Sequence, residues 1–199
     1  IARIQDLGVE IIFNHKVEDL GAEITAGGFD AAFVAVGAHL GKKTDIPARD
    51  AGKVLDAVSF LKSVEMGEKP RLGRRVAVYG GGNTAMDAAR TAKRLGADEA
   101  LIIYRRDRDH MPAHDFEADE ALSEGVKIHW LRTIKSMDEG SITIERMDLQ
   151  DGKPVPTGSY ETLEADSLIL ALGQDSDTAF LKGVKGIAFK EDGTVLVDQ

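Results

Sequence analysis

The apolar residues of this chain follow two patterns, which predict strands and helices. Continuous apolar runs are typical of strands buried on both faces, and apolar residues three and four apart are typical of helices. The N-terminal part predicts the end of a helix, a strand over Val9–Phe13 and, after a short return, a buried strand over Ala31–Val36. A polar loop then extends from Gly37 to about Asp50.

The next segment, Lys53–Glu65, predicts a helix, because its apolar residues recur at helical spacing. Gly67–Gly73, which follows, is rich in turn-forming and charged residues, as is typical of a linker. We therefore expect a domain boundary near this linker.

Beyond the linker the pattern changes to strand, glycine turn, helix and strand. Arg75–Tyr104 has the length of about 30 residues that a βαβ unit requires. A helix is predicted over Asp115–Ser123, and Asp151–Ser159, with two prolines and two glycines, predicts a hairpin-type loop. Further strand-like runs are Val126–Trp130, Ser141–Leu149 and Leu168–Leu172. This order predicts a Rossmann-like α/β fold with a parallel sheet, flanking helices and an antiparallel strand layer.

Composition narrows the classes of function. Of the 199 residues, 43% are apolar and 30% are charged, as in ordinary soluble globular proteins. No apolar run approaches the ~18 residues of a membrane span, and Ile1–Leu7 lacks the features of a secretory signal. The formal net charge of −9 disfavours nucleic acid, because a phosphate backbone requires a basic surface. We expect neither a membrane nor a nucleic acid as a partner.

Cysteine is absent from the chain. Disulfide, thiolate and iron–sulfur chemistry are therefore excluded from these residues, and redox chemistry would have to come from a bound cofactor. The absence fits a reducing cytoplasm, which is the location that we expect. The chain also starts without methionine, and we expect it to be a piece of a longer protein.

The most informative motif is a glycine turn between a strand and a helix. Gly80, Gly82 and Ala85 form the pattern G-x-G-x-x-A directly after the apolar run Val76–Tyr79. Gly80 permits a sharp turn, Gly82 lets the backbone approach a pyrophosphate, and Ala85 allows close packing of helix and strand. The N–H groups and positive dipole end of the helix would then face the diphosphate.

The context of this turn is the one that a dinucleotide-binding motif requires. Thr84 and Asp87 can cap the start of the helix, and Gly96 stands where the helix is expected to end. The helix has an apolar stripe formed by Ala85, Ala88, Ala89, Ala92 and Leu95. The alternative is a glycine-rich turn that only joins a strand to a helix.

Two arginines follow the second strand of this unit. Arg105 and Arg106 come directly after Ala100–Tyr104, where an NAD site typically has an acidic residue for the ribose 2′-hydroxyl. A guanidinium matches the geometry and charge of a 2′-phosphate, which favours NADPH over NADH. The alternative is a solvated basic loop whose charges are balanced by Asp107 and Asp109.

Other candidate residues have simpler structural explanations. His110 and His114 are four residues apart, but Pro112 lies between them and no third ligand has suitable spacing, so we expect no metal site. The acidic residues of Glu117–Glu120 are expected on the polar face of a helix. No residue is assigned a catalytic acid–base role, because hydride transfer depends on the alignment of two rings. Trp130 is expected to pack in the core.

Together these residues resemble the two-dinucleotide-binding flavoproteins, and specifically the small-subunit type of NADPH-dependent glutamate synthase. The resemblance extends through nearly the whole chain. Its most specific parts are Gly80–Asp87, Tyr104-Arg105-Arg106 and Met111-Pro112-Ala113. Further matching segments are Val36-Gly37-Ala38, Asp56–Leu61 and Ala171-Leu172-Gly173-Gln174.

In this family an NADPH domain is inserted into an FAD domain. The resemblance implies that residues 1–50 are a partial FAD-domain segment and crossover, residues 51–174 the NADPH-binding domain, and residues 175–199 a partial return segment. It also implies that the two hallmarks of the FAD site, an earlier G-x-G-x-x-G and a later Gly-Gly-Asp, lie outside this chain. We therefore expect NADPH binding without a complete flavin site, and no turnover by this chain alone.

The resemblance also extends the list of candidate site residues. By pattern alone, the apolar runs that end at Gly37 and Gly173 would be core strands with turn glycines. The resemblance implies that they contact the cofactors, with Ala171 and Gly173 close to the nicotinamide ring. The complete predicted cofactor-binding set is Gly37, Gly80, Gly81, Gly82, Asn83, Thr84, Ala85, Asp87, Tyr104, Arg105, Arg106, Ala171, Gly173 and Gln174.

The function implied by the resemblance is electron transfer from NADPH to FAD and onward to an acceptor, such as iron–sulfur centres on a larger glutamate synthase-type subunit in glutamate biosynthesis. Members of the family serve different acceptors, and nothing in these residues distinguishes them. The alternative is a non-catalytic module that senses NADPH; a gene encoding both FAD motifs would favour the oxidoreductase. A short-chain dehydrogenase is a poor match, because no tyrosine has a lysine four residues further on.

Overall fold

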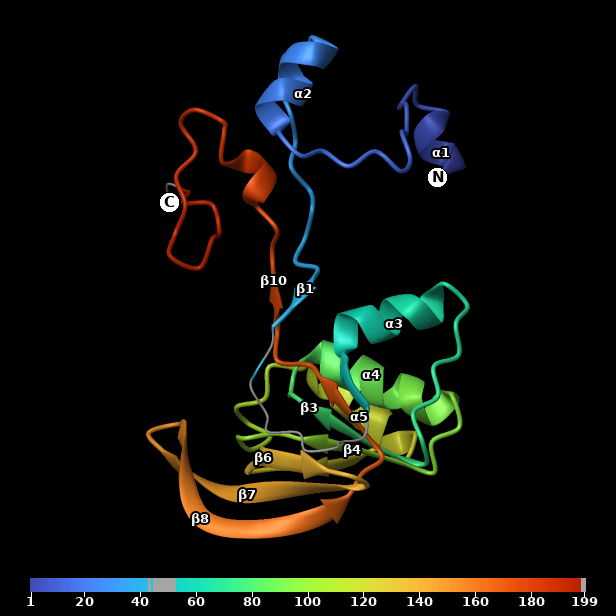
Figure 1. Ribbon diagram of the computed structural model, residues 1–199, viewed down its shortest axis with the longest axis vertical. Helices are drawn as coiled ribbons and strands as arrows, with labels where there is room; N and C mark the ends of the chain where they lie inside the picture. Colours follow the sequence, from blue (N-terminus) through green and yellow to red (C-terminus); the bar gives the residue numbers. More distant parts are fainter. Residues whose placement is uncertain (43, 45–52, 198–199) are drawn as a thin grey trace. The chain divides into compact units, whose positions relative to one another are not determined.

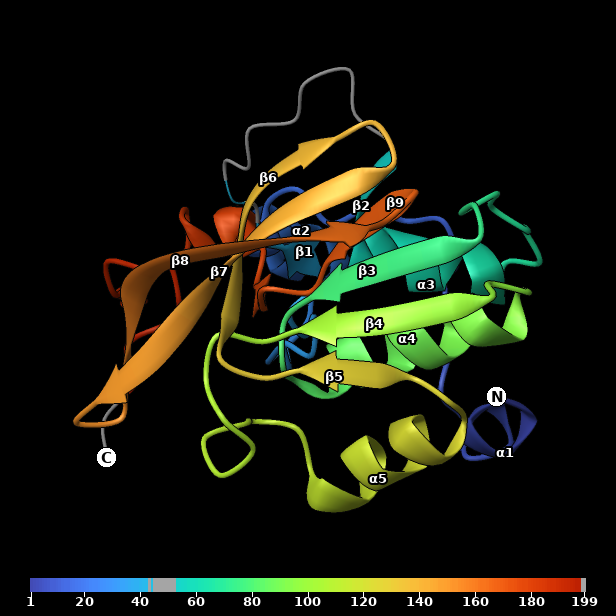
Figure 2. The ribbon, with the colours of Figure 1, turned by 90° about the horizontal axis from the view of Figure 1, so that it is seen from below.

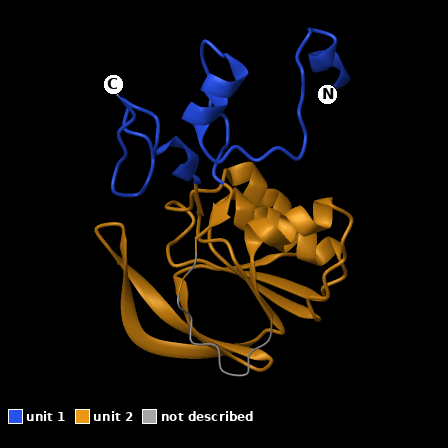
Figure 3. Ribbon diagram, turned by 45° about the horizontal axis from the view of Figure 1, so that its top comes forward, with its two compact units in different colours: residues 1–38, 176–199 blue, residues 39–175 orange. Residues whose placement is uncertain are grey.

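The structure, a computed structural model, describes residues 1–42, 44 and 53–197 and contains two compact units (Figure 3). Unit 1 comprises residues 1–38 and 176–199, and unit 2 comprises residues 39–175. The chain therefore leaves unit 1 after residue 38 and returns to it after residue 175.

Unit 2 is built around a parallel sheet of five described strands (Figure 2). In spatial order these are β2 (Lys53–Asp56), β9 (Ser167–Leu170), β3 (Arg75–Tyr79), β4 (Glu99–Ile103) and β5 (Lys127–His129). In the central strand β3, Val76, Ala77 and Val78 have no exposed surface, because layers cover both faces of the sheet. Burial on both faces explains the continuous apolar run of this strand.

Three helices cover one face of the sheet (Figure 2): α3 (Ala57–Glu65), α4 (Asn83–Arg94) and α5 (Asp115–Ser123). The alanine stripe of α4 consists of residues without exposed surface, namely Ala85, Ala88, Ala89 and Ala92. Such small side chains let a helix approach the strands closely. Gly96, with a φ of +100°, follows the end of α4 in a conformation typical of the residue after a helix.

An antiparallel sheet covers the other face and consists of β6 (Arg132–Asp138), β7 (Ser141–Gln150) and β8 (Lys153–Glu164). Its buried residues Ile134, Met137, Ile142 and Ile144 form one cluster with Leu101, Ile103 and Leu168 of the parallel sheet. Helices, parallel sheet and antiparallel sheet make three layers. The predicted three-layer α/β fold is therefore confirmed.

Two short strands stand near the limits of unit 2. β1 (Leu40–Gly41) and β10 (Gln174–Asp175) form an antiparallel pair (Figure 1). Beside it, the Lys42 N–H donates to the Gly173 carbonyl at 3.0 Å, and the Lys42 ammonium lies 3.2 Å from the Asp175 carboxylate. The outgoing and returning chain segments are thus held side by side.

Unit 1 contains three short helical segments, α1 (Ala2–Gln5), α2 (Leu20–Gly27) and the 3-10 helix η1 (Ala179–Leu181). The N-cap of α2 is Asp19, whose side chain accepts a hydrogen bond from the Ala22 N–H at 3.0 Å. The sequence reading did not predict this helix.

The strands predicted in unit 1 are wrong in this structure. Neither Val9–Phe13 nor Ala31–Val36 pairs with a strand among the described residues, and Phe33 is 95% exposed. An apolar run forms a strand only where a neighbouring backbone supplies the hydrogen bonds of a ladder. The apolar run Ala31–Val36 therefore has the composition of a buried strand, but no described strand pairs with it.

Two predictions around α3 are also wrong. The predicted helix over Lys53–Glu65 is strand β2 as far as Asp56, which accepts a hydrogen bond from the Ser59 N–H at 2.8 Å and so begins α3. The predicted boundary at Gly67–Gly73 lies inside unit 2, because β2 and α3 belong to the same compact unit as β3.

The start of β8 and the end of β9 differ from the predicted positions. The turn expected over Asp151–Ser159 is confined to Asp151 and Gly152, both at positive φ, and β8 includes the two prolines. Proline is tolerated there because β8 pairs with β7 on one side only, as an edge strand. The strand predicted over Leu168–Leu172 ends at Leu170.

Asp166 joins the starts of β3 and β9. Its Oδ2 accepts hydrogen bonds from the backbone N–H groups of Arg74 and Arg75, both at 2.8 Å, and its Oδ1 accepts one from the Arg75 guanidinium at 3.0 Å. The side-chain hydrogen bond from Arg75 is the largest cause that holds the pKa of Asp166 below its ordinary value.

We predict that Asp166→Ala lowers the free energy of unfolding by about 2 kcal/mol at pH 7, because three donors lose a charged acceptor. Asp148→Ala is the matched control: Asp148 is exposed on β7 and forms no ion pair with another described residue, so its effect should stay within about 0.5 kcal/mol. Urea unfolding of both variants and the wild type measures the difference.

The same comparison has a defined pH dependence. A lowered folded-state pKa stabilises the protein above the unfolded pKa of ~3.9, and this stabilisation is lost as the pH falls through the folded value. The difference in the free energy of unfolding between the wild type and Asp166→Ala should therefore become smaller below pH ~4. A gap that is absent at pH 7, or that widens in acid, would contradict the role of Asp166.

Candidate functional site

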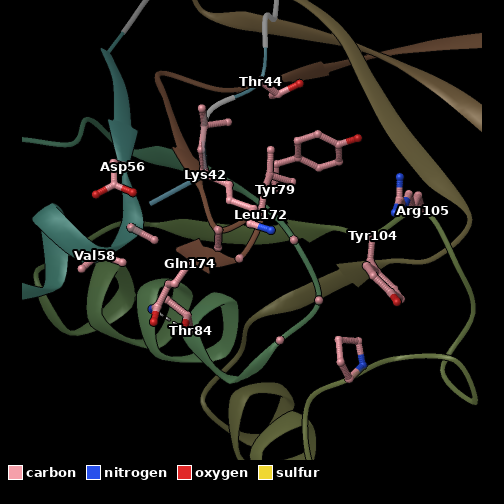
Figure 4. A pocket seen from close by; sticks show the side chains of 18 of the residues that line it. Lys42, Thr44, Asp56, Val58, Tyr79, Thr84, Tyr104, Arg105, Leu172 and Gln174 are labelled. Carbon is pink, nitrogen blue, oxygen red and sulfur yellow. Dashed lines mark hydrogen bonds between the residues drawn. The ribbon is translucent and has the colours of Figure 1, made fainter. Parts of the chain in front are cut away.

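A pocket of about 500 Å³ opens at the carboxyl ends of the parallel strands of unit 2 (Figure 4). Residues at the ends of β2, β9, β3 and β4 line it, and ligands of parallel α/β sheets bind at this edge. Ten of the fourteen predicted cofactor-binding residues lie in its wall: Gly80, Gly81, Gly82, Thr84, Tyr104, Arg105, Arg106, Ala171, Gly173 and Gln174.

The glycine turn passes between two neighbours that leave no space for side chains. A Cβ on Gly80, which has a φ of +151°, would collide with the backbone of Ala171. A Cβ on Gly81 would collide with the ring of Tyr104. A Cβ on Gly82, by contrast, would meet no atom of the described residues within 4 Å. The fold therefore requires the first two glycines, and the third borders open space.

The N-terminus of α4 follows this turn without a side-chain cap. Its N-cap is Gly82, so the predicted capping by Thr84 and Asp87 is wrong. Thr84 instead accepts a hydrogen bond from the Gln174 side chain at 3.4 Å in the pocket wall (Figure 4). The first N–H groups of a helix have no partner within it, and such uncapped groups suit an anion.

Four predicted residues do not line the pocket. Ala85 is fully buried in the helix layer, and Asp87 is exposed. Asn83 Oδ1 accepts a hydrogen bond from the His114 N–H at 3.0 Å and so ties the start of α4 to the start of α5. Gly37 belongs to unit 1, whereas the described lining residues belong to unit 2.

The arginine pair, Arg105 and Arg106, follows β4 at the pocket wall. Its backbone is held on both sides: the Arg132 N–H donates to the Tyr104 carbonyl at 2.9 Å, and the Leu131 N–H donates to the Arg106 carbonyl at 3.0 Å. The Nε of Arg106 is buried and has no acceptor among the described residues. A buried donor without an acceptor is costly unless a ligand supplies one.

The ion pairs of the described residues do not support an arginine pair balanced by nearby aspartates. Asp107 lies 2.6 Å from His110 Nδ1, and this hydrogen bond is the largest cause of its lowered pKa. Arg108 pairs with Asp119 at 2.6 Å. The arginine pair forms no ion pair with a described carboxylate, so its charge is available to a ligand.

The pocket concentrates positive charge in an acidic chain. Its described lining contains the arginine pair and the carboxylate of Asp56, whereas the whole chain has a formal net charge of −9. Lys42 also lines it but pairs with Asp175. Such a local excess attracts anions. The pocket is therefore suited to a ligand with several phosphates.

Nine of the described lining residues are not among the predicted cofactor-binding residues, namely Lys42, Thr44, Asp56, Ala57, Val58, Tyr79, Pro112, Leu170 and Leu172. Asp56 and Val58 lie at the end of β2, which the apolar spacing predicts as part of a helix, so that pattern indicates no strand end there. A usable signal was present: Asp is a favoured N-cap residue, and Asp56 directly precedes the helical pattern. Lys42 and Tyr79 had no local signal.

Tyr104 connects the pocket with the rest of unit 2. Its hydroxyl donates to the His110 carbonyl at 2.8 Å, and its ring meets Trp130 edge-on with centroids 6.3 Å apart. Trp130 is partly buried and belongs to neither core cluster, so the prediction of core packing is wrong. Its contact with a pocket residue makes it a fluorescent reporter of the site.

The remaining candidates have structural roles. Arg90 lies 3.4 Å from Glu117, 2.8 Å from Glu120 and 2.7 Å from Glu124, which joins α4 to α5. In the part of the chain that the structure describes, no group of three or more His, Cys, Asp or Glu side chains could hold a metal ion. Within the same residues, no helix has the length and apolar character to cross a membrane.

Comparison with known proteins identifies relatives. The profile of the family described as pyridine nucleotide-disulphide oxidoreductase matches residues 2–199. The NADPH-Fe(3+) oxidoreductase subunit beta of Geobacter sulfurreducens is 36% identical over 97% of this chain and 31% of its own length. A Cereibacter sphaeroides protein provisionally named glutamate synthase (NADPH) small chain is 32% identical over 100% of this chain and 53% of its own length. The chain thus spans about a third to a half of these relatives.

A solved structure supports the fold. The thioredoxin reductase of T. acidophilum superposes with a TM-score of 0.57 and 18% identity, covering 79% of this chain and 49% of that protein. At this level of identity the likeness extends to the fold alone.

We predict unequal effects on the free energy of unfolding at two positions of the glycine turn. Gly80→Ala should lower the free energy of unfolding by about 2 kcal/mol or more, because its Cβ meets the Ala171 backbone at a strained φ. Gly82→Ala should change it by less than about 1 kcal/mol, because its Cβ meets no protein atom. Urea unfolding measures both, and equal losses would contradict the geometry of the turn.

Proposed function

The chain belongs to the pyridine nucleotide-disulphide oxidoreductase family, and from this membership we propose that it is the NADPH-binding part of a flavin-dependent oxidoreductase of the glutamate synthase small-subunit type. The resemblance predicted from the sequence is confirmed at the level of the family, and membership supports NADPH and FAD as the cofactors. The type of oxidoreductase and its acceptor are part of the proposal.

One observation supports NADPH binding above all others. The glycine turn and the arginine pair line the same pocket, and the arginine pair has no described carboxylate as a partner. A dinucleotide with a 2′-phosphate offers two groups of negative charge, the diphosphate and the 2′-phosphate. The arrangement therefore fits NADPH better than NADH, whose 2′-hydroxyl needs an acceptor.

The residues present fit this cofactor at both charged groups. Gly82 borders space that no protein atom fills, and the uncapped start of α4 offers N–H groups to the diphosphate. The buried Nε of Arg106 has no acceptor among the described residues, and a phosphate oxygen would supply one. The nicotinamide half would lie on the other side of the turn, over Ala171–Gly173.

In the whole protein, bound NADPH would supply a hydride, and bound FAD would supply the group that accepts it and passes the electrons on. For this chain the task is to bind and orient the nicotinamide, which is catalysis by alignment. The 199 residues contain no cysteine, so they hold no redox-active disulphide despite the name of the family.

We further infer a division of labour between the units. Residues 51–174 would form the NADPH-binding domain, and residues 1–50 and 175–199 would contribute to the FAD domain, with Gly37 at its cofactor. The exposed apolar run Ala31–Val36 supports this, since it would be covered as a strand of a larger sheet. The chain contains one G-x-G-x-x-A fingerprint, so we expect it to bind NADPH but to retain no flavin by itself.

The onward acceptor is proposed by analogy with the relatives. One of them is named as a subunit beta and the other as a small chain, which supports a partner subunit, such as a larger glutamate synthase-type or iron–sulfur subunit. A role in glutamate biosynthesis is supported by the name of one relative. The cytoplasmic location expected from the composition stays a prediction.

We predict that the chain binds NADPH at least ~10-fold more tightly than NADH, since one charge-assisted contact can supply the ~1.4 kcal/mol of a tenfold difference. Arg105→Ala combined with Arg106→Ala should abolish this preference. Titration followed by Trp130 emission and nicotinamide fluorescence measures both affinities. Equal binding of the two cofactors by the wild type would remove the role of the arginine pair.

Gly82→Ala provides the test of the glycine turn. We predict that this variant loses affinity for both NADPH and NADH, because its new Cβ occupies space meant for the diphosphate. For the arginine double variant, Arg108→Ala is the control that removes a positive charge outside the pocket. Arg108 pairs with Asp119 and does not line the pocket, so this variant should retain its affinity for NADPH. Unchanged affinity of Gly82→Ala would place the cofactor elsewhere.

A further inference from the structure

Asp56 is the carboxylate in the described wall of the pocket, and it stands at the end of β2 (Figure 4). Its Oδ2 accepts the Ser59 N–H at 2.8 Å and caps α3. Its Oδ1 has no hydrogen-bond donor among the described residues and lies against Gly41, where a Cβ would collide with it. Among the described residues, Oδ1 therefore has Gly41 on one side and no hydrogen-bond donor, so a ligand in the pocket is able to supply that donor.

The order of the strands determines which part of a dinucleotide could reach Asp56. The strand order is β2, β9, β3, β4, β5, so the end of β2 and the arginine pair after β4 lie on opposite sides of the glycine turn that follows β3. Figure 4 shows Asp56 and Val58 on one side of the view and Arg105 on the other. If the 2′-phosphate binds the arginine pair, the nicotinamide end lies toward β9 and β2.

We propose that Asp56 is a positioning residue whose free Oδ1 accepts a hydrogen bond from the carboxamide –NH₂ of nicotinamide. This inference rests on the proposed binding of NADPH. A carboxylate is an acceptor only, and the carboxamide offers N–H donors that the ring itself lacks. Ala57, Val58 and Leu172 supply apolar surface beside it for the ring. Asp56 would thus set the rotation of the ring about its bond to ribose.

Two other polar side chains in this wall have partners among the described residues. The Lys42 ammonium lies 3.2 Å from Asp175, and the Gln174 amide donates to Thr84 at 3.4 Å. Asp, Asn and Ser can all serve as an N-cap, because the cap requires only one side-chain oxygen. The second oxygen distinguishes Asp from the other capping residues, and the test depends on this difference.

The test uses Asp56→Asn and Asp56→Ser in the full chain, because both replacements retain an N-cap for α3. Affinities are measured for three ligands: NADPH, its 3-acetylpyridine analogue, in which a methyl group replaces the carboxamide –NH₂, and 2′,5′-ADP, which lacks nicotinamide. We expect the wild type to bind NADPH about 10-fold more tightly than the analogue, and both variants to lose this preference. Affinity for 2′,5′-ADP should be the same in all three proteins.

A retained preference for the carboxamide in both variants would overturn the inference and leave Asp56 as a helix cap. Equal weakening of NADPH and 2′,5′-ADP would also overturn it, because the change would then be a general disturbance of the pocket. A wild type that binds 2′,5′-ADP but does not distinguish NADPH from the analogue removes the role of Asp56 and leaves the proposed function intact. A wild type that binds neither NADPH nor 2′,5′-ADP removes both.

Discussion

The site depends on the close packing of the glycine turn between the chain after β9 and the ring at the end of β4. Because Gly80 and Gly81 have no Cβ, the end of β3 can pass directly beside the Ala171 backbone and the Tyr104 ring. This contact draws three strand ends together at one edge of the sheet. Larger side chains would separate them, and the wall shared by the turn, the arginine pair and the end of β9 would be lost. The shape of the pocket therefore depends first on the close packing of the backbone at the two glycines, and the side chains then determine which ligand it suits.

Ion pairing determines what the pocket offers a ligand. The acidic chain supplies many carboxylates, yet two that follow the arginine pair along the chain are engaged elsewhere, Asp107 with His110 and Asp119 with Arg108. Arg90 shows the opposite situation, in which a partly buried arginine is surrounded by glutamates of α5 and has a structural role. The arginine pair differs because it follows β4 at the pocket wall. The next residues along the chain, Asp107 and Arg108, are bound to His110 and Asp119. Positive charge without a protein partner is the property that a phosphate requires.

Family membership indicates redox chemistry with a pyridine nucleotide, and the composition of the chain excludes disulphide chemistry from these residues. The family is named for pyridine nucleotide and disulphide chemistry, but this chain has no cysteine. Its G-x-G-x-x-A turn, the pattern typical of dinucleotide sites, lies within a compact unit that the chain enters and leaves by adjacent strands, β1 and β10. A nucleotide-binding unit of this kind suits a protein that passes electrons through bound cofactors, since its own side chains need only bind and orient them.

The sequence by itself determined the three layers of unit 2 and the glycine turn, because these depend on local patterns. Buried strands appear as apolar runs, α4 as an alanine stripe, and the turn as glycines where no Cβ fits. It did not determine β2 or the strand content of unit 1. Lys53–Asp56 has the same apolar spacing as the helix after it, and only its pairing with β9 makes it a strand. Ala31–Val36 has the pattern of a buried strand but no described partner. Tertiary structure alone brought Lys42, Asp56 and Tyr79 to the pocket, because strand order decides which chain ends meet, and strand order is a property of long-range pairing that no local pattern records.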